Sequence, residues 1–290
     1  MTIALGRIGI WSSELRYGDR ETALAEAGAL EGLGYGAIWI PGGIGEIFAD
    51  VTALLDATEH VAVATGILNV WMHPAPEVAA GYDAVRQAHP GRFLLGLGIS
   101  HGPLVDAHGG KYERPLQSMA RYLDDLDVAV PPVPDDKRII AALGPRMLQL
   151  AKDRSAGSHP YLVTPEHTAL ARAVLGAGPV LAPEQAAVLE TDPVVARAIG
   201  RKHLELYLKL PNYTDNFLRI GYTEEDLDSG GSDRLVDGLV AWGDEEAVSA
   251  RVQAHWDAGA DHVCLQLLRR RDETVPSEQW RRLAAVLGGS

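Results

Sequence analysis

The sequence predicts an α/β protein in which eight parallel strands close into a (β/α)8 barrel. Short apolar stretches rich in β-branched residues alternate with stretches of helical periodicity along the whole chain, a pattern that indicates parallel strands with helical crossovers. Eight strand–helix pairs can be counted, and eight is the number that closes such a barrel. The chain has 290 residues, of which 47% are hydrophobic, and this suits one domain over residues 1–290. An open, doubly wound sheet is the alternative.

Proline, glycine and capping residues mark where the predicted elements begin and end. Gly34 ends the first long helix, and Thr164-Pro165-Glu166 combines an N-cap, a first-turn proline and an acid at a helix start. Pro183 makes the seventh strand irregular. The predicted strands cover residues 7–11, 36–40, 61–74 (a range that includes the residues at the strand's exit), 92–100, 138–143, 158–163, 179–189 and 262–268. The predicted helices cover residues 19–33, 47–58, 77–88, 112–130, stretches that begin at 145 and 165, 193–208, 244–258 and 276–287.

Residues 211–238 show neither simple alternation nor one long helical stretch, and they contain the turn sequence Ser229-Gly-Gly-Ser232. We expect short helices and loops there, inserted before the last strand–helix unit. Loops of this kind vary freely on barrels. The insertion is therefore expected near the mouth of a pocket.

The net charge and the composition of the chain limit which kinds of molecule it is expected to bind. The net charge is -13, which argues against general binding to nucleic acids or anionic membranes because both need a basic surface. Cys264 is the one cysteine, so no internal disulfide can form, as suits a reducing cytoplasm. No signal peptide and no stretch approaching about 18 apolar residues is visible. We expect a cytoplasmic protein that acts on a small molecule.

The third predicted strand changes character halfway along. Residues 61–65 are small and apolar, as in a strand buried on both faces. Gly66 then interrupts the strand, and a glycine there marks either a tolerated kink or a bulge where something approaches the backbone. Asn69, Trp71 and His73 follow, and these side chains are more useful at a strand's exit than in a core.

A barrel places its active site at the carboxyl ends of its strands, and here those ends carry many aromatic residues, histidines and glycines but few acids. This composition suits a broad, planar, partly apolar ligand. Gly96-Leu-Gly98 is a weak match to a dinucleotide loop, since it lies inside a strand. His101, His108 and His159 match no standard spacing of metal ligands, so we expect no metal.

Several motifs, in this order and spacing, resemble a known superfamily. They are Gly34-Tyr-Gly-Ala-Ile-Trp39, Thr65-Gly-Ile-Leu-Asn69 with His73-Pro74, Gly91-Arg-Phe-Leu-Leu-Gly-Leu-Gly98, Ala141-Ala-Leu-Gly-Pro-Arg-Met147, Ser158-His-Pro-Tyr-Leu-Val-Thr-Pro-Glu-His167 and Ala258-Gly-Ala-Asp-His262. The chain resembles the bacterial luciferase-like superfamily of flavin and deazaflavin barrels. Within it, the chain is similar to the coenzyme F420-dependent oxidoreductases.

The resemblance implies a cofactor site on the third strand. In that family this strand bulges at a non-proline cis peptide, here between Gly66 and Ile67, and the bulge supports the cofactor ring. The backbone of residues 98–101 would meet the ring, and the amides of residues 157–159 would receive the phosphate-bearing side chain. The cofactor-binding residues implied are Trp11, Trp39, Gly42, Gly43, Gly66, Ile67, Leu68, Asn69, Gly98, Ile99, Ser100, His101, Gly157, Ser158 and His159.

One departure from the family concerns proton transfer. Several F420 enzymes carry a polar pair at the end of the second strand, where this chain has Gly42-Gly43. The proton donor must then come from elsewhere or from the substrate, or else the space admits a larger substrate. His73, His101 and His159 are the candidate catalytic residues, because imidazole titrates near neutral pH.

Three functions remain open at this point. The leading one is an oxidoreductase that transfers hydride between coenzyme F420 and an organic substrate. The second is an FMN-dependent monooxygenase that uses reduced flavin and oxygen, and the third is a non-catalytic barrel that binds flavin or deazaflavin. The resemblance also implies a homodimer.

Overall fold

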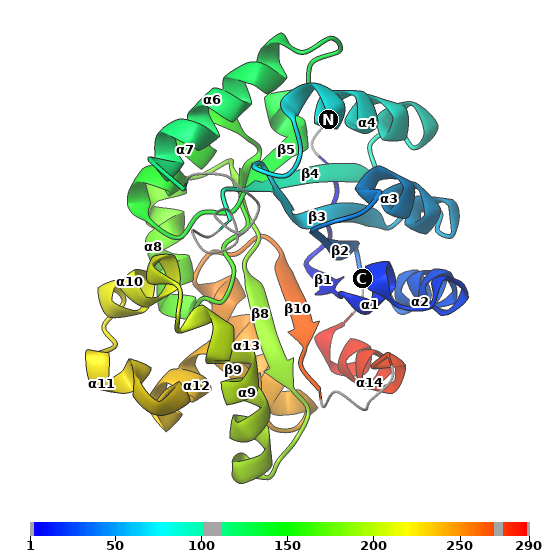
Figure 1. Cartoon of the computed structure of the whole chain (residues 1–290). Coiled ribbons are helices and arrows are strands. Elements are labelled where there is room, and N and C mark those ends of the chain that lie inside the picture. Colours follow the sequence, from blue (N-terminus) through cyan, green and yellow to red (C-terminus); the bar gives the residue numbers. More distant parts are fainter. Residues whose placement is uncertain (1–2, 101–111, 270–274, 289–290) are drawn as a thin grey trace.

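Ten parallel strands form one curled sheet, with helices packed on its outer side (Figure 1). The computed structural model describes residues 3–100, 112–269 and 275–288. The strands are β1 (Ile8–Trp11), β2 (Ala37–Gly42), β3 (Ala62–Asn69), β4 (Phe93–Gly98), β5 (Arg138–Ile140), β6 (Gly157–Ser158), β7 (Val180–Leu181), β8 (Glu184–Val188), β9 (Val240–Trp242) and β10 (Val263–Leu267). Their order is β7-β6-β5-β4-β3-β2-β1-β10-β8-β9. The predicted parallel α/β architecture is confirmed.

The strand count differs from the prediction because the predicted seventh strand is split. β7 pairs with β6, and β8 pairs with β10. Pro183 lies between the two halves and has no N–H to donate to a ladder. Backbone hydrogen bonds nevertheless run from this stretch to both sides: Ala182 N donates to Ser158 O at 2.9 Å, and Cys264 N donates to Pro183 O at 2.9 Å. The split strand therefore links β6 to β10.

Three other strand predictions need correction. The sixth strand ends at Ser158 rather than at residue 163, because Pro160 cannot donate a hydrogen bond and Leu162 takes a left-handed conformation with φ 56°. The fifth strand ends at Ile140, not at residue 143. β9 was not predicted; it pairs with the end of β8.

The helices are close to those predicted, and their starts follow the capping residues. Thr164 caps α8 by accepting a hydrogen bond from His167 N, and Asp192 caps α9 in the same way. The helices are α1 (Glu14–Tyr17), α2 (Arg20–Gly32), α3 (Ile47–Asp56), α4 (Ala75–Ala88), α6 (Pro115–Val128), α7 (Pro145–Arg154), α8 (Pro165–Leu175), α9 (Pro193–Tyr207), α10 (Pro211–Arg219), α11 (Glu224–Leu227), α12 (Asp233–Leu239), α13 (Glu245–Asp257) and α14 (Ser277–Leu287). Short 3₁₀ turns are η1 (Asp135–Lys137) and η2 (Asp228–Gly230). None of the helices described could span a bilayer, given their length and polarity.

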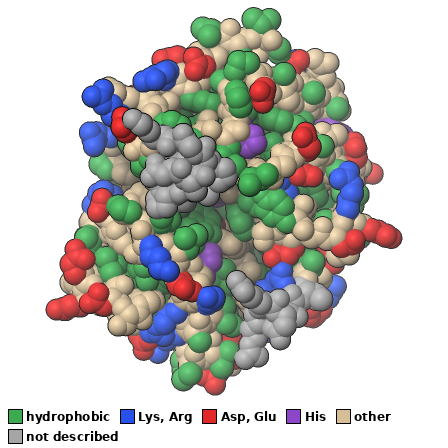
Figure 2. All heavy atoms as spheres, in the orientation of Figure 1, with side chains coloured by type: hydrophobic (Ala, Val, Ile, Leu, Met, Phe, Trp, Pro, Cys, Tyr) green, Lys and Arg blue, Asp and Glu red, His purple; other side chains and the backbone are tan. Residues whose placement is uncertain are grey.

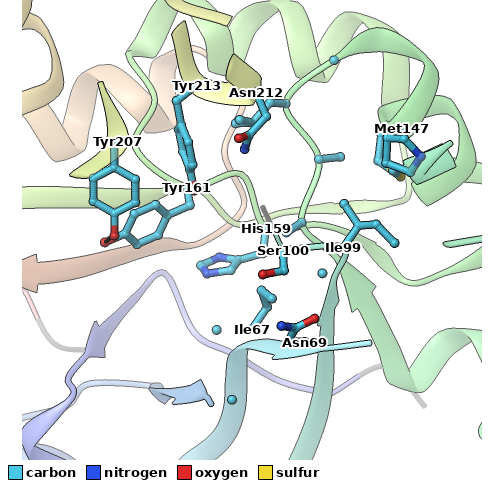
Figure 3. Close-up of a pocket in the computed structure, with 18 of the residues that line it drawn as sticks. Ile67, Asn69, Ile99, Ser100, Met147, His159, Tyr161, Tyr207, Asn212 and Tyr213 are labelled. Carbon is cyan, nitrogen blue, oxygen red and sulfur yellow. Dashed lines mark hydrogen bonds between the residues drawn. The ribbon is translucent and has the colours of Figure 1, made fainter. Parts of the chain in front are cut away.

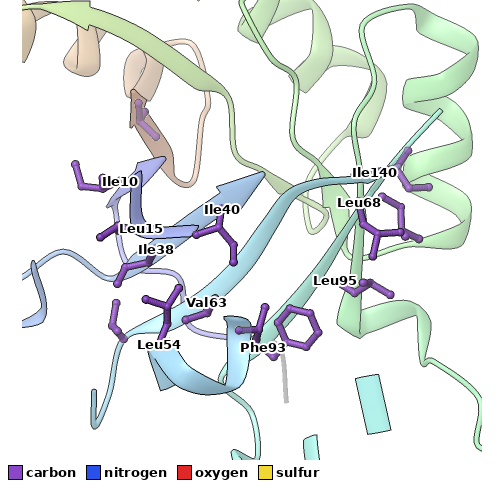
Figure 4. Close-up of a cluster of buried hydrophobic side chains, with 14 of the residues drawn as sticks. Ile10, Leu15, Ile38, Ile40, Leu54, Val63, Leu68, Phe93, Leu95 and Ile140 are labelled. Carbon is purple, nitrogen blue, oxygen red and sulfur yellow. The ribbon is translucent and has the colours of Figure 1, made fainter. Parts of the chain in front are cut away.

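Side chains alternate between the two faces of the curled sheet, as the strand period requires. Ile38 and Ile40 of β2 face the helices and pack with Val63 and Leu54 in the larger core cluster (Figure 4). Trp39, between them in sequence, faces the inside of the curl. There it packs in a separate cluster made mainly of small residues from neighbouring strands. The inside of the curl is therefore filled, and a ligand must sit above it.

Candidate functional site

A cavity of about 430 Å³ opens at the carboxyl ends of β1 to β4. On the face shown in Figure 2 the molecule is hollowed near its centre, where hydrophobic side chains gather. The lining residues come from strand ends, from α7 and from helices α9 and α10, and are Trp11, Pro41, Gly42, Gly43, Gly66, Ile67, Asn69, Met72, Gly98, Ile99, Ser100, Tyr112, Pro115, Ala141, Ala142, Leu143, Gly144, Met147, His159, Tyr161, Tyr207, Asn212, Tyr213, Asp215 and Arg219. Most of this surface is apolar or bare backbone.

β3 carries one residue more than its neighbours at the edge of this cavity. On β3, Ala64 pairs with Leu94 of β4 and Leu68 pairs with Leu97, so β3 has one residue more than β4 between these two pairs. The register between β3 and β2 shifts at the same place. Such a bulge bends the strand and turns its backbone outward. The Gly66–Ile67 peptide bond is cis, as predicted.

One hydrogen bond and two close approaches at glycines hold the bulge in place. The indole Nε1 of Trp11 donates a hydrogen bond to Gly66 O at 2.7 Å. On the two flanking strands, a Cβ at Gly42 would lie 2.5 Å from Leu68 N, and a Cβ at Gly98 would lie 2.5 Å from Ile67 Cγ1. At Gly42 the close atoms belong to the β3 backbone, so the bulge requires glycine there. At Gly98 they belong to the Ile67 side chain, which would have to shift to admit a larger residue.

Two buried polar atoms beside the cavity have no hydrogen-bond partner among the described residues. They are Asn69 Nδ2 and His159 Nε2, and both residues line the cavity (Figure 3). The other end of the Asn69 amide is used, because its Oδ1 accepts a hydrogen bond from Trp71 N at 3.0 Å. Buried polar atoms are almost always paired, so a ligand or a water molecule in the cavity would supply an acceptor to Asn69 Nδ2.

His159 is a neutral acceptor at its cavity-facing nitrogen. Its Nδ1 lies 2.7 Å from Ala182 O, and since a carbonyl can only accept, Nδ1 carries the proton and Nε2 the lone pair. Burial lowers the pKa of His159 to about 4. The ring stacks on Trp39 with centroids 4.2 Å apart. Trp39 in turn donates from Nε1 to His262 Nε2 at 3.0 Å.

A tyrosine wall, defined as Tyr161, Tyr207 and Tyr213, closes one side of the cavity (Figure 3). The rings of Tyr207 and Tyr213 lie 4.9 Å apart, and those of Tyr161 and Tyr207 lie 5.5 Å apart. Tyr207 OH donates to Tyr161 OH at 3.1 Å, and Tyr161 OH donates to Gln266 Oε1 at 2.7 Å. The hydroxyls of Tyr161 and Tyr207 are thus bonded to each other, and the wall presents mainly aromatic surface to a ligand.

Glu184 lies fully buried on β8, behind the tyrosine wall. Its Oε2 accepts a hydrogen bond from Leu162 N at 2.9 Å, which supports the left-handed turn between His159 and α8. Burial raises the pKa of this carboxyl to about 8. Glu184 is therefore mainly protonated at neutral pH.

The structure brings most of the predicted cofactor residues together around the cavity. Those that line it are Trp11, Gly42, Gly43, Gly66, Ile67, Asn69, Gly98, Ile99, Ser100 and His159. His101 lies outside the described residues.

Five predicted residues do not line the cavity. Trp39 is fully buried inside the curl, and Leu68 points to the helix layer. Gly157 and Ser158 lie in the ladder with β7, where Ser158 Oγ bonds to Ile140 O at 3.1 Å. His73 lies beyond the rim, where its carbonyl accepts a hydrogen bond from Tyr122 OH. For Trp39 and Leu68 the reason is that alternate residues of a strand face opposite sides. For His73, Gly157 and Ser158, closeness to the site in sequence was not enough.

Several of the lining residues that the sequence prediction missed come from helices, and others, such as Tyr161, come from loops. Tyr207 is on α9, and Asn212, Tyr213, Asp215 and Arg219 are on α10. Pro211 at the start of α10 was visible in the sequence, but the direction in which that helix lies was not. Among the described residues, no group of three or more His, Cys, Asp or Glu side chains is placed to hold a metal ion.

Comparison with known proteins shows which proteins this chain is similar to. Residues 3–126 match the family model described as luciferase-like monooxygenase. No curated protein matches the chain. A solved F420-dependent secondary alcohol dehydrogenase, in complex with an F420–acetone adduct, is similar over 100% of this chain and 99% of that one, with 16% identity and a TM-score of 0.71.

Two further solved structures extend the comparison. The coenzyme F420-dependent tetrahydromethanopterin reductase from Methanopyrus kandleri has 14% identity and a TM-score of 0.66 over 98% of this chain and 97% of that one. The oxygenating constituent of 3,6-diketocamphane monooxygenase from Pseudomonas putida, in complex with FMN, has 13% identity and a TM-score of 0.68 over 99% and 97%. At these identities the likeness shows the fold. With the family-model match, it confirms the predicted resemblance to the luciferase-like superfamily.

The tight contacts at Gly66 predict a specific cost for an added methyl group. A Cβ there would lie 2.8 Å from Trp11 Nε1 and 3.2 Å from His159 Nε2. We expect Gly66→Ala to lower the free energy of unfolding by about 1–3 kcal/mol, the usual cost of overpacking. Gly32→Ala, at a helix position with open space around it, is the control and should be neutral or stabilising. Equal denaturant midpoints for the two variants would contradict this account of the bulge.

The raised pKa of Glu184 predicts how stability depends on pH. The carboxyl titrates at 4.5 in an unfolded chain and at about 8 when folded. Between these values the folded state holds more protons, so this group lowers the free energy of unfolding as pH rises, by about 1.4 kcal/mol per unit at most. Glu184→Gln removes the effect and can keep the bond to Leu162 N. Its stability relative to the unmodified protein should rise from pH 5 to pH 8 in urea titrations; a difference that stays constant would refute the assignment.

Proposed function

We propose that the protein is an oxidoreductase that transfers hydride between coenzyme F420 and a small organic substrate. The observation that carries the proposal is the bulged β3 beneath an apolar cavity, with Asn69 Nδ2 and His159 Nε2 unpaired beside it. The similarity in fold to an F420-dependent alcohol dehydrogenase over the full chain supports the same class of cofactor. The chain's own residues account for binding and orientation, and a bound deazaflavin would supply the hydride chemistry.

The residues present fit the polar edge of a flavin or deazaflavin ring. That edge carries carbonyl oxygens beside a ring N–H. Asn69 Nδ2 would donate to a carbonyl oxygen, and the lone pair on His159 Nε2 would accept from the N–H. Trp11, Ile67 and Ile99 would exclude water from the ring.

None of the three histidines named as candidate proton donors is assigned that role here. Of the three candidates, His159 lines the cavity, His73 does not, and His101 lies outside the described residues. With a pKa of about 4, His159 carries no proton on Nε2 at neutral pH. We therefore assign it the role of an acceptor that orients the ligand. The proton would reach the substrate from another group or from solvent.

We also propose that the sheet closes into an eight-stranded barrel and that residues 1–290 form one domain. The hydrogen bonds on both sides of the split seventh strand support this closure. Residues 211–238 would form its mouth, because Asn212, Tyr213, Asp215 and Arg219 reach the cavity.

An FMN-dependent monooxygenase is the second candidate. It is favoured by the description of the matching family model and by the FMN-bound relative. Arg219 is the one cation among the described lining residues, and it already donates to Asn216 Oδ1 at 3.0 Å. Either cofactor has an anionic side chain that Arg219 could meet.

Titration of the purified apo-protein with each cofactor tests the choice. We expect F420 to bind at least tenfold more tightly than FMN in a fluorescence titration. Reduced F420 should then be oxidised by one or more members of a panel of ketones, aldehydes and enones. Tighter binding of FMN, with oxygen consumed when reduced FMN and a substrate are added, would replace the proposal with a monooxygenase.

Asn69→Asp tests the donor in the cavity. The variant keeps an acceptor for Trp71 N but replaces Nδ2 by an oxygen, so a ring carbonyl would face a carboxylate instead of a donor. We expect F420 affinity to fall by about 10- to 100-fold, the cost of an unpaired buried group. Asn212→Asp adds the same charge at the cavity mouth and is the matched control. If both variants lose affinity equally, the effect is one of charge and the role of Asn69 is wrong.

A further inference from the structure

Arg16 is a buried cation next to the exit of β2, and it does not itself line the cavity. It lies on α1, the short helix that follows β1 and lies beside β2 (Figure 1). Its side chain is 0% exposed. Burying a charge is costly unless the charge is paired and hydrogen-bonded. The bonds of Arg16 therefore show what its burial achieves.

Three of the five N–H groups of Arg16 hold the turn at the end of β2. Nη1 donates to the carbonyl oxygen of Pro41, and Nη2 donates to those of Gly43 at 3.2 Å and Ile44 at 3.1 Å. We refer to residues 41–44 as the β2 turn. One side chain can hold three carbonyls in this way because the donors of a guanidinium group form a rigid, planar fork.

The other two N–H groups of Arg16 are also paired. Nη1 donates to Tyr17 OH at 2.9 Å, and Nε donates to Oδ2 of Asp50, on α3, at 3.0 Å. Asp50 also supplies the opposite charge, so the cation is balanced within the chain. Arg16 thus joins α1 and α3 to the β2 turn, and it has no N–H group left for a ligand.

The β2 turn forms one wall of the cavity. Pro41, Gly42 and Gly43 all line the cavity, and Gly42 pairs with Leu68 of β3 next to the bulge. Two successive glycines have more backbone freedom than other residues, so their own sequence does not fix the shape of this wall. The bonds from Arg16 to the carbonyls on either side of Gly42 fix it instead.

Other arginines make bonds of the same kind at the opposite ends of the strands. Arg92 donates to the carbonyls of Leu55, Thr58 and Val61, all of which precede β3. Arg138, Arg172 and Arg251 likewise bond to two or more carbonyls in segments that precede strands. In barrels the amino ends of the strands serve stability and the carboxyl ends carry the active site. Arg16 makes such bonds at a carboxyl end.

We propose that Arg16 is a positioning residue of the cavity, which fixes the β2 turn in the shape that a bound cofactor meets. A turn that is already ordered spares the ligand the entropic cost of ordering it, and this raises affinity. That the cofactor is F420 rests on the proposed function. The role of Arg16 applies equally to FMN, so the two proposals can fail separately.

Arg16→Lys and Arg92→Lys form a matched pair of variants that test this role. Each keeps the positive charge, but one ammonium group cannot reproduce the fork that holds three carbonyls. We expect both variants to have a lower melting temperature than the unmodified protein. Arg16→Lys should also weaken binding of the cofactor by about tenfold, because the β2 turn is no longer held. Arg92→Lys, at the other end of the barrel, should change the affinity by less than about twofold.

The cofactor in this test is whichever of F420 and FMN the unmodified protein binds more tightly, measured by fluorescence titration. Equal affinities in Arg16→Lys and Arg92→Lys would overturn the proposal. A preference for FMN, with the loss still confined to Arg16→Lys, would overturn the proposed function and leave the role of Arg16 intact.

A second measurement needs neither a variant nor a cofactor. Relaxation of the ¹⁵N-labelled amides of Gly42 and Gly43 in the unmodified protein reports whether the β2 turn is held before a ligand binds. We expect order parameters of about 0.85, as in rigid backbone. Values below about 0.6, typical of flexible segments, would show that Arg16 does not fix the turn and would overturn the proposal.

Discussion

The site depends on one extra residue in β3, where the strand steps out of register with both neighbours. A bulge in an internal strand can persist only where the adjacent strands make room for it. Gly42 on β2 and Gly98 on β4 supply that room, and Trp11 on β1 holds the displaced carbonyl of Gly66. The bulge in β3 thus constrains which residues β1, β2 and β4 can carry next to it. The shape of the cavity floor is therefore set by the ladder of these four strands.

A column of neutral rings inside the curl supports the other side of the site. His262 accepts from Trp39, Trp39 stacks on His159, and His159 bonds to the carbonyl of Ala182. Burial lowers the pKa of both histidines to about 4, so the column carries no charge at neutral pH. Trp39 does not line the cavity, but by stacking on His159 it fixes the plane of the imidazole ring that does.

The sequence predicted the first four strands well because a period of two and a glycine or proline stop are local features, but it placed the ends of the fifth and sixth strands too late. The resemblance to the luciferase-like superfamily implied a shared site for Gly66, Asn69 and Gly98, and the structure places all three around one cavity. The sequence could not show that Trp39 faces the inside of the curl and Leu68 the helix layer, because the face of each residue depends on strand register. It also missed the tyrosine wall, since the position of α10 depends on packing between distant segments. Leu162 shows the same limit: its left-handed turn is supported by Glu184, far along the chain.

A crystal structure of the protein with F420 would test the central claim most directly. We predict the deazaflavin ring against Gly66 to Asn69, with a ring carbonyl within hydrogen-bond distance of Asn69 Nδ2 and its N–H facing His159 Nε2. A ring bound elsewhere, or a straight β3 with the cavity filled by side chains, would contradict the account.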